Sequence, residues 1–442
     1  MLSVISYPVS RSELSPFRRF FKILGPGLIT GASDDDPSGI ATYSQAGAQF
    51  GIGALWFALF QYPMMTVVQE MCGRIGLVTG SGVAGSIKKK YSGKIVYPLA
   101  SLLLIANTIN IGADIGAMSA SVGLIFPQLP IILVTVFFVT LIIITEILIP
   151  YKTYVKILKY LTLALFAYVA TAIIVGGNWN DIIIASITPH IEFNSTFAIM
   201  FVAIFGTTIS PYLFFWQASE EAEEDVAKNK IKEIGEGKPK ITKKEIKVMR
   251  EDVVIGMAFS QLIMWFIILT TAGTLHSNGV TDIGTAEQAA QALEPLVKTF
   301  PNAGKISATI FALGIIGTGL LTIPILAGSS AYALADGFGW KQGLNKKFKQ
   351  AKAFYFVIAA STTIGLWINF MNTDPIKMLF YTAVINGVIA VPLLIAIMRI
   401  ANDKKILHHK TNGKISNVIG WTTVTIMGFA VFVMFLTWNK LI

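Results

Sequence analysis

The 442-residue chain is 54% hydrophobic and only 14% charged, whereas soluble domains contain about 25% charged residues. This composition indicates a protein of the lipid bilayer and excludes soluble enzymes, secreted scaffolds and DNA-binding modules. The formal net charge of +10 does not indicate a nucleic-acid partner, because so apolar a chain has little solvated surface for binding phosphates. Its single cysteine, Cys72, excludes an intrachain disulfide and a thiolate metal cluster.

Eleven apolar segments follow one another along the chain. Each is long enough to cross a hydrocarbon layer about 30 Å thick, which needs roughly 20 mostly apolar residues per helix. We expect transmembrane helices near residues 22–46, 52–72, 96–123, 131–149, 157–176, 196–218, 253–275, 304–335, 353–371, 378–400 and 418–438. The predicted fold is an all-α polytopic membrane protein with eleven transmembrane helices.

These spans divide the chain into three parts. Residues 1–21 form a cytoplasmic tail, residues 22–400 form the core, and residues 401–442 form a loop and the eleventh helix. Within the core, the connection at about 219–250 is rich in Lys and Glu, and we expect a solvated helix and turn there. A regulatory or partner-binding role is the alternative for that connection, although we infer no obligate protein partner.

Positive charge favours one side of this topology. With a cytoplasmic N-terminus, all but four of the 35 Lys and Arg residues fall on the cytoplasmic side, in the tail, in cytoplasmic connections or at the cytoplasmic ends of spans. The exceptions are Lys298, Lys305, Lys377 and Lys440. Because cytoplasmic loops carry such an excess, we expect a multi-pass protein of the cell membrane with its N-terminus in the cytoplasm and its C-terminus outside.

The first and sixth predicted spans contain helix-breaking residues, Asp36-Pro37 and Ser210-Pro211. Proline removes a backbone donor and clashes with the preceding turn. Unwound backbone persists at membrane depth only where it lines a cavity or is buried in protein. If residues 22–176 and 196–400 are two five-helix repeats, the two breaks lie in corresponding positions. Such pairing indicates an inverted-repeat transporter with a site at the bilayer midplane, and ordinary proline kinks are the alternative.

Several acidic residues fall inside the predicted spans, where a carboxylate costs about 2.5–3.5 kcal/mol even on the lenient insertion scale. They are Asp34, Asp35, Asp36, Glu70, Asp114 and Glu146, and the sequence offers none of them a Lys or Arg within the hydrophobic layer. Acids without a base imply a cation as the counter-charge, which disfavours an anionic organic substrate.

These acids differ in their expected roles. Asp36 precedes a proline, which favours non-helical backbone, so its carboxylate and nearby carbonyls are expected to converge on an ion. Asp34 and Asp35 either contact the ion or cap the second half-helix. Asp114 either lines the ion route or is a buried, hydrogen-bonded acid, and Glu70 is expected to be structural or interfacial.

Side chains at the two breaks offer oxygen ligands alone. They are Asp36, Ser38, Thr207, Thr208 and Ser210. Oxygen-only sites suit Mg²⁺, Ca²⁺ or Mn²⁺, whereas thioether or imidazole ligands favour later transition metals. The sequence contains neither H-E-x-x-H nor G-x-x-x-x-G-K-[ST], so we expect neither an enzyme nor a resident cofactor.

Gly25-Pro26-Gly27, Asp36-Pro37, Ser210-Pro211 and the eleven spans resemble the Nramp family of divalent metal transporters over nearly the whole chain. The resemblance implies a LeuT-like fold of two inverted five-helix repeats with broken helices one and six. It places Asp36 at the family's metal-binding aspartate, with backbone oxygens from Ser33 and Thr207. Gly39 stands where the family has a metal-binding Asn, and Ser210 stands where it has Met.

Other positions also depart from the family pattern. Tyr212 and Gln217 replace two histidines, and Asp114-Ile115-Gly116-Ala117 keeps the Asp of the third helix but loses its Glu. Losing Met removes discrimination against hard cations, and losing His and Glu removes groups of the proton path. The pattern is similar to the Nramp-related magnesium transporters. Residues expected along the ion route or around the first ligands are Asp34, Asp35, Ser38, Asn110, Asp114, Tyr212 and Asn386.

The sequence therefore predicts uptake of hydrated Mg²⁺, and also Mn²⁺, as transported substrate by alternating access around Asp36, without tight proton coupling. One alternative is a proton-coupled Mn²⁺/Fe²⁺ transporter of the ordinary Nramp type. Another is a cation-coupled symporter for amino acids or other organic solutes on the same fold.

Overall fold

The computed structural model describes residues 26–91, 93–149, 161–370 and 374–437, and regular structure in these ranges is helical apart from one isolated bridge between Glu233 and Glu236. The expectation of an all-α protein is confirmed for these residues. The expected tail, 1–21, and the margins of several expected spans (22–25, 157–160, 371 and 438) lie outside the described residues.

The first half of the chain contains two short helices, two long ones and several shorter pieces. In order they are α2 (Pro26–Asp34), α3 (Pro37–Phe50), η1 (Gly51–Ala54), α4 (Trp56–Thr79), α5 (Val83–Lys90), α6 (Gly93–Ile125), α7 (Ile131–Leu148), η2 (Leu161–Leu165), α9 (Phe166–Val175) and α10 (Trp179–Ile187).

The second half begins with another pair of shorter helices. In order the elements are α11 (Ser195–Thr208), α12 (Pro211–Ala227), α13 (Lys243–Thr274), η3 (His276–Asn278), α14 (Ala286–Gln291), α15 (Glu294–Val297), α16 (Ala303–Phe338), η4 (Phe348–Gln350), α17 (Lys352–Ile368), α18 (Pro375–Ala401), α19 (Lys404–Leu407) and α20 (Lys414–Thr437).

Seven spans in the described ranges are long and apolar enough to cross a membrane, counting α11 and α12 together as one. If α3 and η1 are counted together with α4 as one span, the number rises to eight, although the helix axis bends by 109° between these two parts. Fewer than the expected eleven pass, because α2 and α3 have only 9 and 14 residues and α17 has 17. The described part of the fifth expected span is also a short apolar helix, Leu163–Val175.

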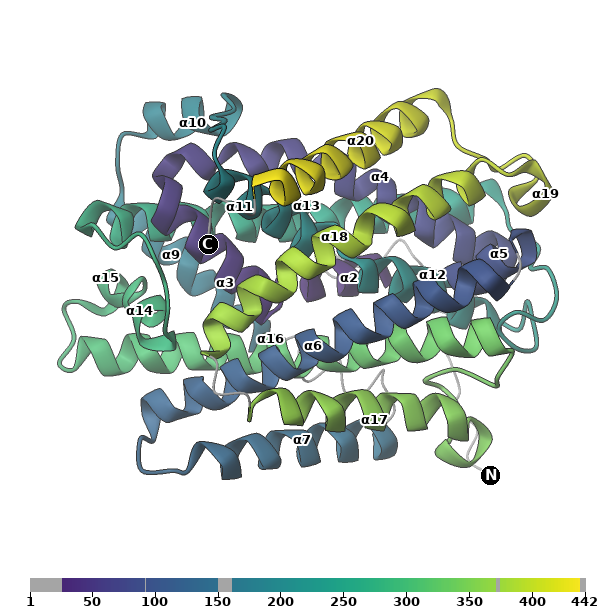
Figure 1. Ribbon diagram of the computed structural model, residues 1–442, viewed down its shortest axis with the longest axis horizontal. Helices are drawn as coiled ribbons and strands as arrows, with labels where there is room; N and C mark the ends of the chain where they lie inside the picture. Colours follow the sequence, from purple (N-terminus) through teal and green to yellow (C-terminus); the bar gives the residue numbers. More distant parts are fainter. Residues whose placement is uncertain (1–25, 92, 150–160, 371–373, 438–442) are drawn as a thin grey trace, which may run out of the picture.

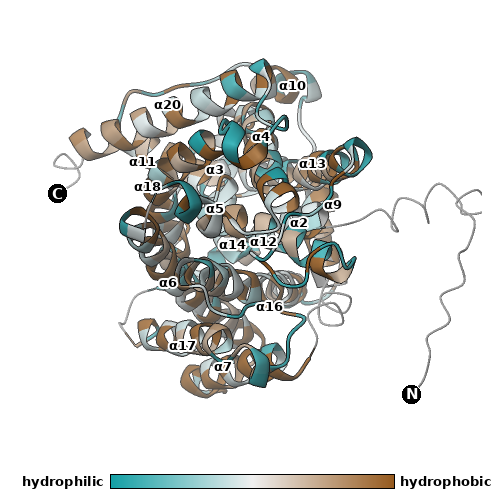
Figure 2. Cartoon of the chain, turned by 90° about the vertical axis from the view of Figure 1, so that its right-hand side faces the viewer, coloured by the Kyte–Doolittle hydropathy of each residue, from teal (hydrophilic) through white to brown (hydrophobic). Residues whose placement is uncertain are grey.

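The outer helices carry apolar side chains on their free faces, as a lipid environment requires. Only 28% of the apolar stretch of α7 and of α20 is buried inside the protein. Leu133 on α7 and Phe429 on α20 are each 65% exposed. Figure 2 shows these helices at the periphery with brown, hydrophobic residues along them.

Both predicted helix breaks are present. α2 ends at Asp34 and α3 begins at Pro37, while α11 ends at Thr208 and α12 begins at Pro211. Each proline occupies the first turn of the second half-helix, where its missing N–H costs nothing and its fixed φ suits the helix. Sequence and local geometry therefore agree at both breaks.

The core is built by close helix contacts. α6 lies along α16, and α2 and α3 pack on α13 (Figure 1). Glycines permit the closest approaches, since a Cβ on Gly31 would lie 2.2 Å from the Gly256 carbonyl oxygen of α13. Similarly, a Cβ on Gly206 of α11 would lie 2.0 Å from the Ala383 carbonyl oxygen of α18. These contacts hold both breaks against long helices.

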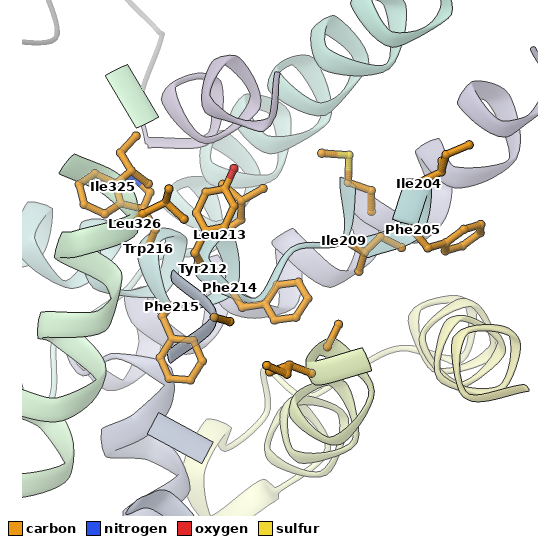
Figure 3. Packing of buried hydrophobic residues seen from close by; sticks show 14 of the residues in the cluster. Ile204, Phe205, Ile209, Tyr212, Leu213, Phe214, Phe215, Trp216, Ile325 and Leu326 are labelled. Carbon is orange, nitrogen blue, oxygen red and sulfur yellow. The ribbon is translucent and has the colours of Figure 1, made fainter. Parts of the chain in front are cut away.

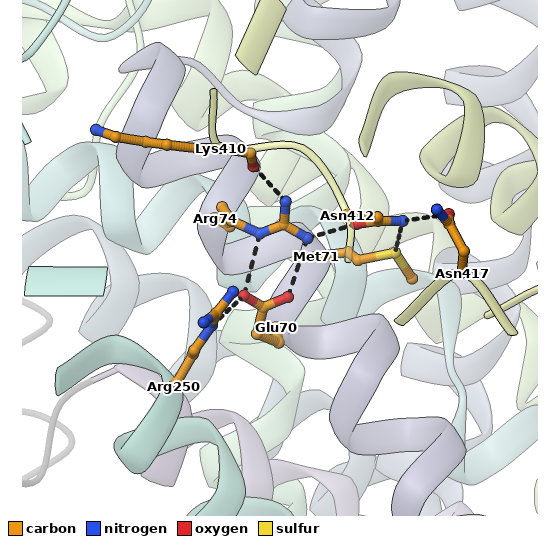
Figure 4. Close-up of polar contacts among 7 residues, drawn as sticks. All are labelled: Glu70, Met71, Arg74, Arg250, Lys410, Asn412 and Asn417. Atoms are coloured by element: carbon orange, nitrogen blue, oxygen red, sulfur yellow. Dashed lines mark hydrogen bonds and ion pairs between the residues drawn. The ribbon is translucent and has the colours of Figure 1, made fainter. Parts of the chain in front are cut away.

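One intramembrane acid has basic partners. Glu70 of α4 accepts hydrogen bonds from Arg74 at 3.0 Å and from Arg250 of α13 at 2.7 Å (Figure 4). Arg74 also donates to the Lys410 carbonyl oxygen and to Asn412 in the loop before α20. Both arginines fall just outside the predicted spans 52–72 and 253–275, and the expected structural role of Glu70 agrees with this network.

The Lys- and Glu-rich connection is more packed than expected. α12 continues to Ala227, and its acidic residues Glu221, Glu223 and Asp225 are buried rather than solvated. Glu223 accepts hydrogen bonds from the Tyr332 hydroxyl and the Leu344 backbone N–H, both at 2.6 Å. The acidic side chains of α12 thus anchor it to α16 and to the loop that follows.

We expect Gly206→Ala to destabilise the protein by about 1–3 kcal/mol, because the added methyl meets backbone atoms of α18 that cannot move aside easily. Thermal unfolding of the purified protein measures this change as a lower Tm. Gly123→Ala is the matched control, since a Cβ there meets nothing within 4 Å. Equal Tm values for the two variants would contradict the argument.

Candidate metal site

Asp36 lies in the gap between α2 and α3 and is fully buried. Its Oδ1 accepts hydrogen bonds from the Gly39 backbone N–H at 2.6 Å and from the Ser38 hydroxyl at 2.8 Å. Its Oδ2 accepts a hydrogen bond from the Asn110 amide of α6 at 3.2 Å. This is an N-cap arrangement, and it fixes the carboxylate while leaving lone pairs for a cation.

The second break approaches Asp36 through Thr207, near the end of α11. The Thr207 hydroxyl oxygen lies 3.5 Å from that of Ser38. A Cβ on Gly39 would lie 3.3 Å from Asp36 Oδ1 and 3.4 Å from the Thr207 hydroxyl oxygen. A Cβ there would also lie 2.9 Å from the Asp34 carbonyl oxygen, so the absence of a side chain at position 39 lets α3 approach the end of α2 and Thr207 closely beside the carboxylate.

Ser210 occupies the N-cap position of α12 without capping it. Its hydroxyl is fully buried and has no hydrogen-bond partner among the described residues. Figure 3 shows the apolar side chains around this junction, with Ile209 before the turn and Tyr212 to Trp216 along α12. A buried hydroxyl without a partner in an apolar surrounding is available as an oxygen ligand.

The Ser33 carbonyl, expected to offer oxygen to a metal, is already engaged. It accepts a hydrogen bond from the Tyr212 hydroxyl at 2.9 Å and a longer one from Thr322 of α16 at 3.4 Å. The Ser33 hydroxyl donates to the Ile29 carbonyl oxygen. Tyr212 thus links the first turn of α12 to the end of α2 in this conformation.

The remaining predicted polar groups make no hydrogen bond to Asp36, although Asp34, Asp35 and Asp114 lie close enough to interact with it electrostatically. The carboxylate oxygens of Asp35 and Asp114 and the amide of Asn386 are buried and lack hydrogen bonds within the described ranges. Asp34 Oδ2 accepts a hydrogen bond from Ser260 of α13 at 2.5 Å. In the part of the chain that the structure describes, no three His, Cys, Asp or Glu side chains form a metal-chelating group. A cation at Asp36 would therefore complete its coordination with neutral oxygens and water.

The sequence alone did not identify three residues that lie near the breaks. Tyr43 lies seven positions after Asp36 on α3, so helical spacing places both on one face and was a usable signal. Ser260 and Thr322 come from α13 and α16, long apolar helices in which one hydroxyl carries no signal. Only the packing of these helices on α2 brings the two hydroxyls to the site.

A protein-family profile described as Nramp, natural resistance-associated macrophage protein-like, matches residues 27–437. The chain belongs to the Nramp family. Among curated proteins, it is 24% identical over 434 residues to "Divalent metal cation transporter MntH" of Klebsiella pneumoniae subsp. pneumoniae, covering 95% of each chain. It is also 24% identical over 423 residues to the protein of that name in Aeromonas hydrophila subsp. hydrophila, covering 93% of this chain and 95% of the relative.

Solved structures show the same fold at low sequence identity. The crystal structure of an Eremococcus coleocola manganese transporter superposes with a TM-score of 0.73 at 14% identity, covering 97% of this chain and 88% of that one. This Nramp chain therefore has a transporter fold, in which α2 with α3 and α11 with α12 are the broken helices.

We expect Asn110→Ala to weaken binding of a divalent cation at Asp36 by about tenfold or more, since a hydrogen bond to a charged group contributes about 1.5–3 kcal/mol. Isothermal titration of the purified protein with Mn²⁺ or Mg²⁺ measures the affinity. Asn107→Ala is the control, because Asn107 lies one turn earlier on α6 and donates to α16 instead. An equal loss in both variants would show that Asn110 does not act through Asp36.

Proposed function

We propose that this Nramp chain transports divalent metal cations across a membrane by alternating access around Asp36. The observation that carries the proposal is the meeting of the two helix breaks, where the Ser38 hydroxyl, which donates to Asp36, lies 3.5 Å from that of Thr207 in buried surroundings. Family membership and the similarity to divalent metal cation transporters support it.

The finer architecture is part of this proposal. Eleven spans, arranged as two inverted repeats of five helices and a final helix, would place the two broken helices in corresponding positions, as in transporters with a midplane site. The excess of Lys and Arg in connections assigned to the cytoplasm supports a cytoplasmic N-terminus, an external C-terminus and a place in the cell membrane.

For the ion, we propose hydrated Mg²⁺, with Mn²⁺ also accepted. The proposed ligands are the Asp36 carboxylate, the Ser210 hydroxyl and backbone oxygens of Ser33 and Thr207, with Gly39 in place of a ligating side chain. Mg²⁺ dehydrates reluctantly and keeps several waters, so it suits a site with one carboxylate whose other protein ligands are neutral oxygens. In the conformation described, Tyr212 would have to release the Ser33 carbonyl before that oxygen could bind the ion.

The polar groups around these ligands would form the route of the ion. Asp34, Asp35 and Asp114 are buried acids, Ser38 and Asn110 orient Asp36, and Tyr212 and Asn386 lie on α12 and α18. We assign these residues to the passage and to support of the ligands rather than to the ligand set itself.

We also propose that transport is not tightly coupled to protons. Tyr212 donates its hydroxyl to a backbone carbonyl, and Gln217 accepts a hydrogen bond from Thr30 and donates one to Glu221. Neither side chain is a proton carrier at neutral pH. The second candidate, proton-coupled Mn²⁺/Fe²⁺ transport, is favoured by the unpartnered buried carboxylate of Asp114, which could carry a proton.

Reconstituted protein should admit both Mg²⁺ and Mn²⁺ into liposomes without acidifying the lumen, and Asp36→Ala should abolish the flux of both. Fluorescent metal indicators measure the Mg²⁺ and Mn²⁺ fluxes, and an internal probe measures the lumenal pH at the same time. Asp181→Ala, in α10 away from both breaks, is the matched control and should transport normally. Mn²⁺ flux with acidification and no competition by Mg²⁺ would establish the proton-coupled alternative.

Ser210→Met should shift selectivity from Mg²⁺ toward Mn²⁺ and Cd²⁺, because thioether sulfur prefers softer ions. Competition of each ion against Mn²⁺ uptake measures the change. Leu213→Met, three residues later on α12, adds the same sulfur at another buried position and should leave the order unchanged. An unaltered order for Ser210→Met would place this side chain outside the ligands.

A further inference from the structure

Asp34 and Asp36 lie two residues apart but face different helices. Asp36 is held by the start of α3 and by Asn110 of α6, whereas Asp34 accepts a hydrogen bond from Ser260 of α13 at 2.5 Å. The two carboxylates are therefore held by different elements, although they lie close enough to interact electrostatically.

The Asp34 carboxylate is completely buried and only half satisfied. Its Oδ2 is bound by Ser260, but no described residue donates a hydrogen bond to its Oδ1. The groups that interact with it include Ser260, Tyr43 and the carboxylates of Asp35 and Asp36, and none of these carries a positive charge. A buried carboxylate in such a place requires a cation or another compensating group.

Tyr43 supplies an independent indication of a ligand. Its hydroxyl is fully buried and lies near enough to interact with Asp34 and with Thr207. It nevertheless makes no hydrogen bond of normal geometry within the described part of the chain. A tyrosine hydroxyl normally finds a partner when it is buried, so the unpaired oxygen of Tyr43 is available as a ligand beside Asp34.

The C-terminal end of α2 contributes an electrostatic field that favours a cation. Asp34 is the last residue of this half-helix, so the carbonyl groups of its final turn lack intrahelical partners and carry the negative end of the helix dipole. Broken helices of membrane transporters coordinate small cations through such unwound carbonyls and half-helix ends. The field at this position thus favours a positive charge.

We propose that Asp34, Ser260 and Tyr43 form a second cation site, between α2, α3 and α13, which binds a small monovalent cation of the Na⁺ type. The one carboxylate ligand of this site, with two neutral hydroxyls, balances a single positive charge. The close contact of Gly31 with Gly256 holds α2 tightly against α13, which favours a small ion over a large one. Binding at this site joins the end of α2 to α13, independently of the ion that Asp36 carries.

The test compares the Tm of the purified full-length protein in NaCl and in choline chloride of equal concentration, with divalent ions removed by chelation. A ligand that binds the folded state raises the Tm in a saturable manner, so we expect Na⁺ to do so. Asp34→Asn, Ser260→Ala and Tyr43→Phe should each reduce or abolish the Na⁺ effect. Thr274→Val is the matched control, since this hydroxyl of α13 donates to its own helix and should leave the effect intact.

Failure of this proposal and failure of the metal proposal are distinguishable. Asp36→Asn should lose the response to Mg²⁺ or Mn²⁺ but keep the response to Na⁺, and Ser260→Ala should do the reverse. Equal Tm values of the wild type in Na⁺ and choline, or an undiminished Na⁺ effect in Ser260→Ala and Tyr43→Phe, would overturn the second site. If Asp34→Asn does not purify as a single species, these two milder variants decide the outcome.

Discussion

The structure depends on one electrostatic constraint, a carboxylate held in a membrane protein where the helix that carries it is broken. Asp36 is buried, and its donors are a backbone N–H, a neighbouring hydroxyl and an amide from α6. Such a group is tolerated because the start of α3 offers unpaired N–H groups and the positive end of a helix dipole. Neither source is a fixed counter-ion, so the site keeps its capacity to accept a mobile one.

Other features of the fold maintain this arrangement. The end of α2 is tied to α12 through the Tyr212 hydroxyl and to α13 through Asp34 and Ser260. Further along α2, Thr30 donates to Gln217 of α12, and the Gly27 N–H donates to Asp252 of α13 at 2.7 Å. The short helix is therefore fixed by polar contacts at several depths, and movement of α2 would have to break them together.

Charge is divided between two environments in this molecule. Within α4, Glu70 meets Arg74 and Arg250 and forms ion pairs (Figure 4). Around the first break, Asp34 accepts a hydrogen bond from Ser260, the carboxylates of Asp35 and Asp114 have no hydrogen-bond partner, and no basic side chain bonds to these acids in the described ranges. This difference is why we propose cation binding at the break and a structural role for Glu70.

By itself the sequence determined the membrane class, the helical fold and both breaks, because composition, hydrophobic length and proline act locally and leave a direct trace in the chain. It also placed Asp36 at the first break and indicated that the side chains around both breaks offer oxygen atoms, since the residue types adjacent to each proline are part of the same local pattern. Only the tertiary structure decided that Glu70 is paired with Arg74 and Arg250, that the acids of α12 are buried, and that the Ser33 carbonyl is bound by Tyr212. It also brought Ser260 and Thr322 to the first break. These contacts join helices distant in the chain, and their geometry is set by glycine-mediated packing between helices, which no periodicity within a single helix records.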